Sequence, residues 1–307
     1  RGLVGGARGL PGLRCRVMGS GGGRRIAGSR REGVAEAVSD DVVHEDWDGT
    51  DVSIGEVLDR LAAQRRPGGG RPVALTGVLN LIGYAPRPAE LPRMAALVDG
   101  LGGGRPSRAV LIAGGDGPGG IDATVSTSCL LGGDHEGVAV ETVTLTLRGE
   151  AREGAASAVV PLLRPDLPTV LWWPGPPDAA GDGPLERLAP VVDRVVTESG
   201  RAGDAGVAAL ARWAPGSAAH VTDLAWAHIT PWRQLIAQMI DGEPLGVLRA
   251  APASAALAHG GDAPDAATLL LAGWLADVVG PGLAVAIEPG PAGAPPGPWS
   301  VDLRVPG

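Results

Sequence analysis

The sequence of 307 residues has no phenylalanine and no lysine, one tyrosine and only two cysteines, Cys15 and Cys129. Two cysteines cannot build the disulfide framework of a small secreted protein. No apolar run reaches the roughly 20 residues that cross a bilayer. Glycine and arginine also interrupt every apolar stretch near the basic N-terminus that could serve as a secretory signal. These absences predict a cytoplasmic protein without a membrane partner.

Charge is unevenly distributed along the chain. All 26 basic residues are arginines, and eight of them lie within residues 1–31, where there is no acid. The remaining chain has 18 arginines against 34 acids, a net charge of −16. A body this acidic repels nucleic acid and anionic membranes. Residues 1–41 are rich in Gly, Arg and Ser without periodicity, which predicts a disordered or non-native leader.

Hydrophobic periodicity predicts mixed helices and strands after this leader. Ser53 and Glu56 form a capping box that opens a helix over 53–65. Alternating apolar and polar residues over 121–129 and 138–147 predict an antiparallel hairpin. Further helices are expected at 88–98, 155–163, 184–189, 203–213 and 230–240, the last with Thr230 as its N-cap and Pro231 at its first position. Further strands are expected at 73–84, 109–113, 169–173 and 194–197.

The remaining C-terminal pattern predicts a smaller unit. It is read as a strand over 245–250, a helix over 265–279 and strands over 283–288 and 299–305. The fold class is therefore α/β (α+β), with a mixed β-sheet N-terminal domain flanked by helices over 42–242 and a smaller C-terminal α/β domain over 243–307.

No familiar catalytic or metal-binding pattern stands out. The glycine-rich segment 113–120 lacks the Lys of a P-loop and precedes a strand, so we interpret it as a flexible hairpin loop. The histidines (44, 135, 220, 228 and 259) lack metal-ligand spacing, which predicts no metal site. Ser128 and Cys129 lie mid-strand, not on a nucleophile elbow. Five acids could pair for glycoside hydrolysis, but solvated carboxylates are the simpler reading: Asp166, Asp178, Asp182, Asp193 and Asp223.

Tryptophan is the most informative residue, because five of the eight lie between 172 and 232. Side chains alternate along a strand, so Trp172 and Trp173 before Pro174 should lie on opposite faces of a strand end. The second phrase runs from Asp223 through Trp226 to Trp232 and Arg233. Three readings remain open: stacking on a sugar, docking on a protein, or a core in which Trp replaces the missing Phe.

These phrases resemble the glucose-6-phosphate dehydrogenase assembly protein family (OpcA). The resemblance is carried by Trp172-Trp173-Pro174, by Asp223-Leu224 with Trp226, and by Ile229-Thr230-Pro231-Trp232-Arg233 about sixty residues after the first phrase. Residues 158–166 and 274–277 also fit the family. Residues 1–41 have no counterpart in it, and the chain is expected to stop before the usual C-terminal end of the family. Only Cys129 lies in the matching region, so cysteine-based redox control is not carried over.

The resemblance implies a non-catalytic cytoplasmic protein that promotes assembly or activity of glucose-6-phosphate dehydrogenase in the bacterial oxidative pentose phosphate pathway. It implies no cofactor and no metal, and a protein partner. The candidate partner-binding or structural residues are Trp172, Trp173, Pro174, Asp223, Trp226, Thr230, Pro231, Trp232 and Arg233. Two alternatives stay open: an enzyme or sensor that binds a sugar phosphate or nucleotide in a Trp-lined cleft, and a purely structural scaffold.

Overall fold

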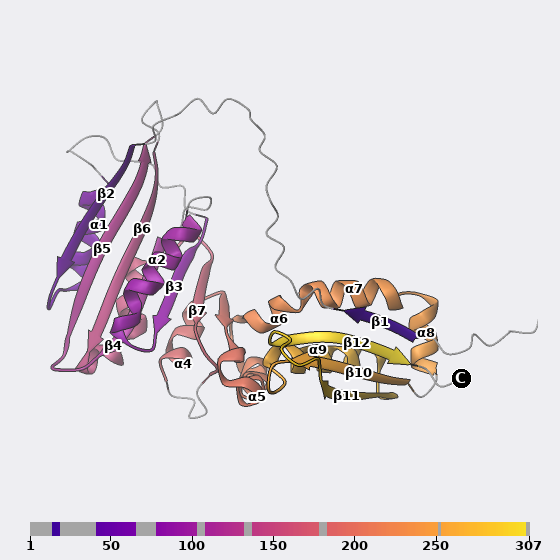
Figure 1. Ribbon diagram of the computed structural model, residues 1–307. Helices are drawn as coiled ribbons and strands as arrows, with labels where there is room; N and C mark the ends of the chain where they lie inside the picture. The colour runs from indigo at the N-terminus through magenta and orange to yellow at the C-terminus, as the bar shows by residue number, and fades with distance from the viewer. Residues whose placement is uncertain are drawn as a thin grey trace, which may run out of the picture. The chain divides into compact units, whose positions relative to one another are not determined.

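The computed structural model describes residues 14–18, 41–65, 78–102, 108–131, 137–177, 183–250 and 253–304. The chain divides into two compact units (Figure 1). The larger unit comprises Arg30–Glu198 and Ala209–Thr222, and the smaller comprises Arg1–Ser29, Ser199–Ala208 and Asp223–Gly307. Each unit combines a sheet with helices, which confirms the predicted α/β class.

The larger unit is built on an eight-stranded mixed sheet in the order β2-β5-β6-β4-β3-β7-β8-β9. Each neighbouring pair from β6 through β4, β3 and β7 to β8 is parallel. Strand β5 pairs antiparallel with β2 on one side and with β6 on the other. The strands are β2 Asp41–Gly49, β3 Asn80–Ala85, β4 Arg108–Gly115, β5 Gly120–Leu131, β6 Gly137–Arg148, β7 Thr169–Trp173, β8 Arg194–Thr197 and β9 His220–Asp223.

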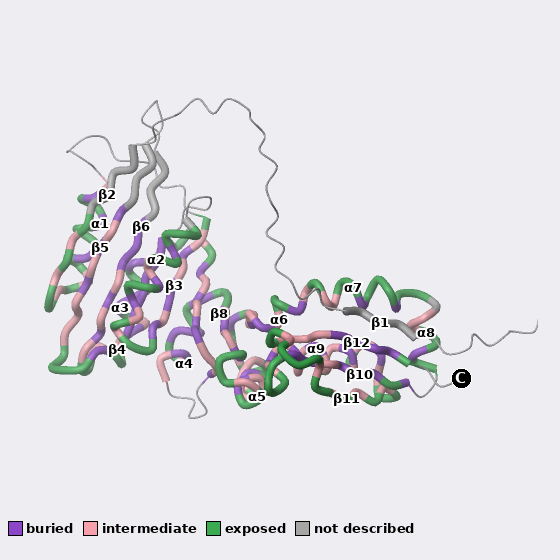
Figure 2. Tube along the Cα trace, viewed as in Figure 1, coloured by how far each residue is buried: buried purple, intermediate pink, exposed green. Residues whose placement is uncertain are grey.

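Helices cover both faces of this sheet, and Figure 2 shows buried positions along its central strands. The α-helices that belong wholly to this unit are α1 Ile54–Gln64, α2 Leu91–Gly102, α3 Ala155–Val159 and α4 Pro184–Leu188. Short 3₁₀ turns flank them: η2 Pro88–Glu90, η3 Gly149–Arg152, η4 Val160–Leu162, η5 Ala189–Val191 and η7 Ala214–Gly216. Helix α5, Gly203–Trp213, contributes residues to both units.

The two crossover helices beside β3 lie on opposite faces of the sheet. Helix α2 joins β3 to β4 and packs Met94 and Val98 against Leu111. Helix α4 joins β7 to β8 and packs Leu185 and Leu188 into the core on the other face. Right-handed crossovers on opposite faces advance the strand order in opposite directions. The order therefore reverses between β3 and β7, and this point organises the candidate site described below.

Several local predictions for this unit are confirmed. The backbone N–H of Glu56 donates to Ser53 Oγ at 3.2 Å, and the N–H of Ser53 donates to Glu56 Oε2 at 2.7 Å, so the capping box is present. Strands β5 and β6 pair antiparallel as expected. The strand predicted at 73–84 begins only at Asn80, and residues 73–77 lie outside the described residues.

Two interpretations of the larger unit were wrong or incomplete. The glycine-rich segment 113–120 is no hairpin loop, because it joins β4 to β5 and β6 lies between these two strands. The hairpin signal came from glycine alone, which marks a tight connection without saying which strands pair. Strand β2 was not predicted, since its acidic sequence lacks the clean alternation of a half-buried strand.

The smaller unit carries a four-stranded sheet in the order β1-β12-β10-β11. Its strands are β1 Arg14–Met18, β10 Ala253–Gly260, β11 Leu283–Pro289 and β12 Gly297–Arg304. Its helices are α6 Leu224–His228, α7 Thr230–Ile240, α8 Glu243–Ala250 and α9 Ala266–Val279, with η6 Ser199–Ala202. Its core gathers Ile236 and Ile240 of α7, Leu271 and Leu275 of α9, and Leu257 of β10.

The strand predicted at 245–250 was wrong, because these residues form helix α8 and the strand β10 follows it. Short apolar runs do not separate helix from strand, and alanine-rich β10 carries little strand propensity of its own. Its pairing with β11 on one side and β12 on the other stabilises it instead.

The division between the units also differs from the expected boundary at 242. Helix α7 belongs to the smaller unit, since Ile236 and Ile240 are buried in that unit's core. Within the expected leader, Arg14–Met18 form strand β1 against β12, and the other residues of 1–40 lie outside the described residues.

Two buried polar networks fix the strand ends of the larger unit. Asn80, the only asparagine in the chain, donates through Nδ2 to the carbonyls of Arg164 and Leu167 and to Thr169 Oγ1, and its Oδ1 accepts from the N–H of Arg164. It thereby joins β3 to the loop that precedes β7. Buried amides satisfied in this way specify one arrangement, because each alternative leaves donors unpaired.

The second network pairs Glu141, which is 2 % exposed, with two arginines. Arg65 Nε donates to Glu141 Oε1 at 2.6 Å, and Arg108 Nε donates to Oε2 at 2.7 Å. Arg108 Nη1 also donates to the carbonyl of Leu162 at 2.8 Å. Burial lowers the pKa of the Arg108 guanidinium, and Glu141 opposes that shift. The carboxylate is therefore the main compensation for a buried cation.

We predict that Glu141→Gln lowers the stability of the larger unit by about 3 kcal/mol or more, because it leaves Arg108 buried without a counter-charge. Urea unfolding followed by circular dichroism measures the effect. The matched control is Glu90→Gln, whose partner Arg87 is exposed, and it should cost less than about 1 kcal/mol. Equal midpoints for the two variants would contradict this role of Glu141.

Candidate functional site

The first candidate residues lie at the carboxyl end of β7, and Trp172 and Trp173 face opposite sides of the sheet as predicted. Trp173 is 6 % exposed and belongs to the core that holds Ile82 and Leu171. Trp172 packs on the other face beside Met94 and Leu111. Gly83 makes room for the two neighbours of Trp172, since a Cβ there would lie 2.6 Å from Leu111 Cδ2 and 2.9 Å from Met94 Cε.

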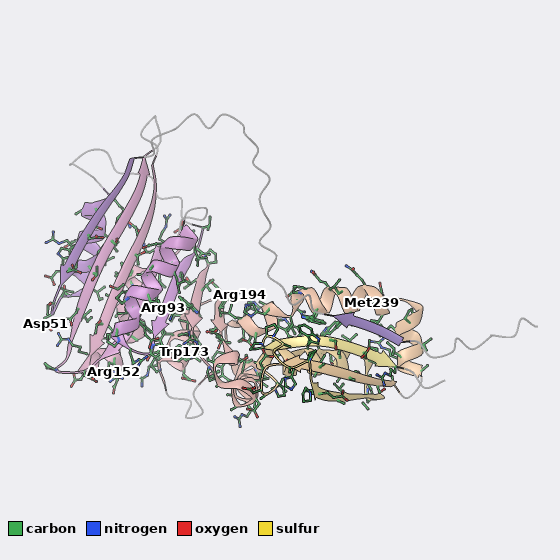
Figure 3. All side chains as sticks on the ribbon, in the orientation of Figure 1. Asp51, Arg93, Arg152, Trp173, Arg194 and Met239 are labelled. Carbon is green, nitrogen blue, oxygen red and sulfur yellow. The ribbon has the colours of Figure 1, made fainter. Side chains whose placement is uncertain are left out.

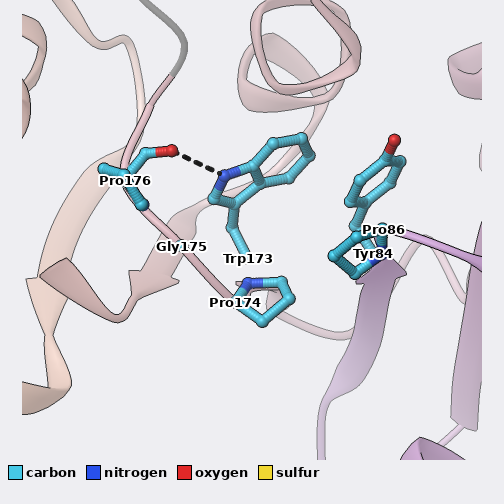
Figure 4. A pocket seen from close by; sticks show the side chains of 6 residues that line it. All are labelled: Tyr84, Pro86, Trp173, Pro174, Gly175 and Pro176. Carbon is cyan, nitrogen blue, oxygen red and sulfur yellow. Dashed lines mark hydrogen bonds between the residues drawn. The ribbon is translucent and has the colours of Figure 1, made fainter. Parts of the chain in front are cut away.

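Trp173 also lines a pocket of about 270 Å³ at the ends of β3 and β7 (Figure 4). Its ring stacks on Tyr84, with 4.3 Å between ring centroids and 17° between ring planes. The remaining lining residues are Pro86, Pro174, Gly175 and Pro176. Aromatic and proline rings make up most of the lining, so the wall is rigid, and polar and apolar atoms share its accessible surface about equally.

Several polar groups of this wall are hydrogen-bonded within the protein. Trp173 Nε1 donates to the carbonyl of Pro176 at 3.3 Å, and the N–H of Gly175 donates to the carbonyl of Trp173 at 2.9 Å. The hydroxyl of Thr197, at the end of β8, donates to the carbonyl of Gly175. These bonds fix the turn after β7, so the pocket is formed before any ligand arrives.

The second group of candidates belongs to the smaller unit and begins with Asp223. Its carboxylate is buried and accepts hydrogen bonds from the N–H of Ser199 at 3.1 Å, the hydroxyl of Ser199 at 2.5 Å and the N–H of Ala225 at 3.2 Å. Asp223 therefore caps α6 and joins it to η6. All these contacts are structural.

Arg233 is held by its own helix and by a tryptophan. Its guanidinium lies 3.9 Å from the centroid of the Trp226 ring, a cation–π contact, and Nη2 donates to Thr230 Oγ1 at 2.9 Å. Thr230 is the first residue of α7 and accepts a hydrogen bond from Arg233, and Ile229 takes the N-cap position expected for Thr230. Pro231 is therefore the second residue of the helix and not, as was expected, the first. Arg233 Nε is buried and has no hydrogen-bond partner within the described part of the chain.

The large apolar side chains of α7 lie on two faces of the helix. Trp232, Ile236 and Ile240 pack against the core of the smaller unit. Leu235 and Met239 instead point outward, with 50 % and 41 % of their surfaces exposed, and Figure 3 labels Met239 on α7. Large apolar side chains at i and i+4 on an exposed helix face form a small contiguous patch.

The other chemistry considered from the sequence finds no support as a site. Among the described residues, no group of three His, Cys, Asp or Glu side chains is arranged to hold a metal ion, and no helix is long and apolar enough to cross a membrane. Asp166 pairs with Arg164, and Asp193 accepts from the N–H of Thr169. The side chains of Ser128 and Cys129, like residues 178–182, lie outside the described ones.

Comparison with protein families assigns both parts of this chain. Residues 99–214 match the OpcA assembly family model described as the glucose-6-phosphate dehydrogenase subunit N-terminal domain, and residues 219–306 match the corresponding C-terminal domain. The chain belongs to the OpcA family. A search of curated proteins gave no match.

The two OpcA domains meet close to the structural division at Asp223. Trp172, Trp173 and Pro174 lie in the N-terminal domain, and the phrase from Asp223 to Arg233 lies in the C-terminal domain. The candidate residues therefore form two groups, one in each unit.

Sequence reasoning missed the other pocket residues, Tyr84, Pro86, Gly175 and Pro176. The sequence feature that could have revealed them is the density of aromatic and proline residues at the ends of two predicted strands, at 84–88 and 172–177. Parallel pairing brings these two strand ends together, and the sequence does not reveal that β3 and β7 are neighbours.

We predict that Asp223→Ala destabilises the smaller unit by about 2 kcal/mol, because it removes a helix cap and leaves buried donors of Ser199 unpaired. Urea unfolding again provides the measurement. Asp204→Ala is the matched control, since that carboxylate is exposed and, among the described residues, accepts only the N–H of Ala205. Its effect should stay within about 0.5 kcal/mol. A neutral Asp223→Ala would leave partner binding as the remaining role for this residue.

Proposed function

We propose that this chain is a non-catalytic assembly factor and allosteric activator of glucose-6-phosphate dehydrogenase, acting in the cytoplasm on the entry step of the bacterial pentose phosphate pathway. The match of residues 99–306 to two domains described as parts of a glucose-6-phosphate dehydrogenase subunit carries the proposal. A subunit description fits a protein that works by contact with the enzyme.

The outer face of α7 is our candidate for the contact with the dehydrogenase. Pro231, Leu235 and Met239 succeed one another every four residues along this helix, and all three are exposed. Methionine adapts its shape to a partner surface, and leucine supplies apolar area. Trp226, Trp232 and Arg233 lie beneath and beside this face, where they hold the helix in place. We propose the same supporting role for Trp172, Trp173 and Pro174 in the other unit.

Activation requires that the chain bind the active dehydrogenase more tightly than the inactive form. A ligand can shift a conformational equilibrium only by its difference in affinity for the two states. A tenfold difference corresponds to about 1.4 kcal/mol, which a few well-packed side chains supply. The proposal therefore needs only a modest docking surface.

We predict that saturating amounts of this chain raise the kcat or lower the KM of the dehydrogenase, and that the chain alone turns over no glucose 6-phosphate. Steady-state NADPH formation, with and without the chain, measures both. Unchanged kinetic constants together with separate elution in size-exclusion chromatography would refute the proposal, as would turnover by the chain alone.

We further predict that Leu235→Glu weakens binding to the dehydrogenase about tenfold or more, because it places a charge in the apolar contact. The matched control is Gln238→Glu, which adds the same charge at another exposed position of α7 and should change the affinity less than about threefold. Biolayer interferometry gives both dissociation constants. Equal affinities for the two variants would place the contact elsewhere.

A further inference from the structure

The pocket at the ends of β3 and β7 lies where an open parallel sheet ordinarily binds its ligand. The strand order reverses between these two strands, because α2 and α4 lie on opposite faces. Such a switch point leaves a crevice outside the carboxyl ends of the strands, and ligands of doubly wound folds bind there. The ring-lined cavity of about 270 Å³ occupies this position. Its size is just below the roughly 300 Å³ at which small-molecule sites begin.

A cation lies at the same edge of the same sheet face. The guanidinium of Arg152 lies against Gly114, near the end of β4. A Cβ built at Gly114 would lie 2.8 Å from Nε and 3.1 Å from Nη2 of Arg152. Because side chains alternate, Gly114 shares its face with Val110 and Ile112, which belong to the core that also holds Trp173. β4 pairs with β3 so that Ala113 lies opposite Ala85. The guanidinium is therefore one strand away from Tyr84 and Pro86.

Arg152 is available to a ligand. Its side chain is exposed, and in the described ranges no hydrogen bond or ion pair engages it, in contrast to Arg148, which pairs with Asp122. Figure 3 places Arg152 and Trp173 along the same edge of the sheet. The neighbouring Glu150 and Glu153 reduce the local positive potential, so any anion held here binds with modest affinity.

We propose that this edge binds a mononucleotide-type ligand, a flat uncharged heteroaromatic ring that carries a phosphate. The ring packs against the wall of Tyr84, Trp173 and the prolines, and the phosphate pairs with Arg152. The wall favours such a ring over a sugar, since a planar ring packs closely against the lining rings, and Trp173 Nε1 and the carbonyl of Gly175 are already hydrogen-bonded within the protein. The site lies wholly in the larger unit and does not depend on the dehydrogenase, so it would stand even if the proposed function failed.

The test is isothermal titration of the full chain alone with AMP, glucose 6-phosphate and inorganic phosphate. We expect AMP to bind one site with a dissociation constant below about 1 mM, and about tenfold more tightly than either other probe. Equal binding of phosphate and AMP would show that the ring wall contributes nothing and would overturn the proposal. Preference for glucose 6-phosphate, or no binding of AMP, would overturn it as well.

Two substitutions locate the site without disturbing the buried stack. Arg152→Gln removes the charge, and Gly114→Ala forces the guanidinium away from the strand end while retaining the charge. Each should weaken AMP binding about tenfold, the effect of losing one charged hydrogen-bond partner. Arg93→Gln, an exposed arginine on α2, is the matched control and should have no effect. Wild-type affinity in both test variants, with circular dichroism unchanged, would exclude Arg152 as the anchor.

Discussion

Packing of tryptophan against the apolar cores is the interaction on which both units depend. The chain has no phenylalanine and a single tyrosine, so few side chains supply large apolar area, and a buried aromatic ring contributes more of it than any aliphatic residue. Seven of the eight tryptophans pack against one of three core clusters. Trp173 stacks on Tyr84 in the larger unit, and Trp226 carries Arg233 in the smaller. The two phrases that resemble the OpcA family thus have a structural role before any functional one.

This use of tryptophan decides which residues remain for contact with other molecules. The polar groups of Trp173, Asp223 and Arg233 form hydrogen bonds with residues of the same unit. Their neighbours are exposed instead: Leu235 and Met239 on α7, and Arg152 beside the pocket. Both proposed surfaces therefore border the tryptophan-rich segments without consisting mainly of them. A rigid, buried support beneath an exposed contact is also what keeps the entropic cost of binding low.

Local signals in the sequence were enough for much of the fold. The capping box at Ser53 and the alternation in β5 and β6 each depend on neighbours only a few residues away. The errors lie in segments whose structure depends on contacts with residues far away in the sequence. Strand β10 is an alanine-rich segment held between two partners, and α8 is too short and irregular for its period to be read. The pocket is the extreme case, since it exists only because β3 pairs with β7 across 89 residues of chain.

The most direct measurement of the central claim is hydrogen–deuterium exchange of this chain in the presence and absence of glucose-6-phosphate dehydrogenase. Docking through the outer face of α7 predicts slower exchange in peptides from Thr230–Ile240 when the dehydrogenase is present, with the eight-stranded sheet unchanged. Exchange that is the same along the whole chain at saturating dehydrogenase would contradict the account.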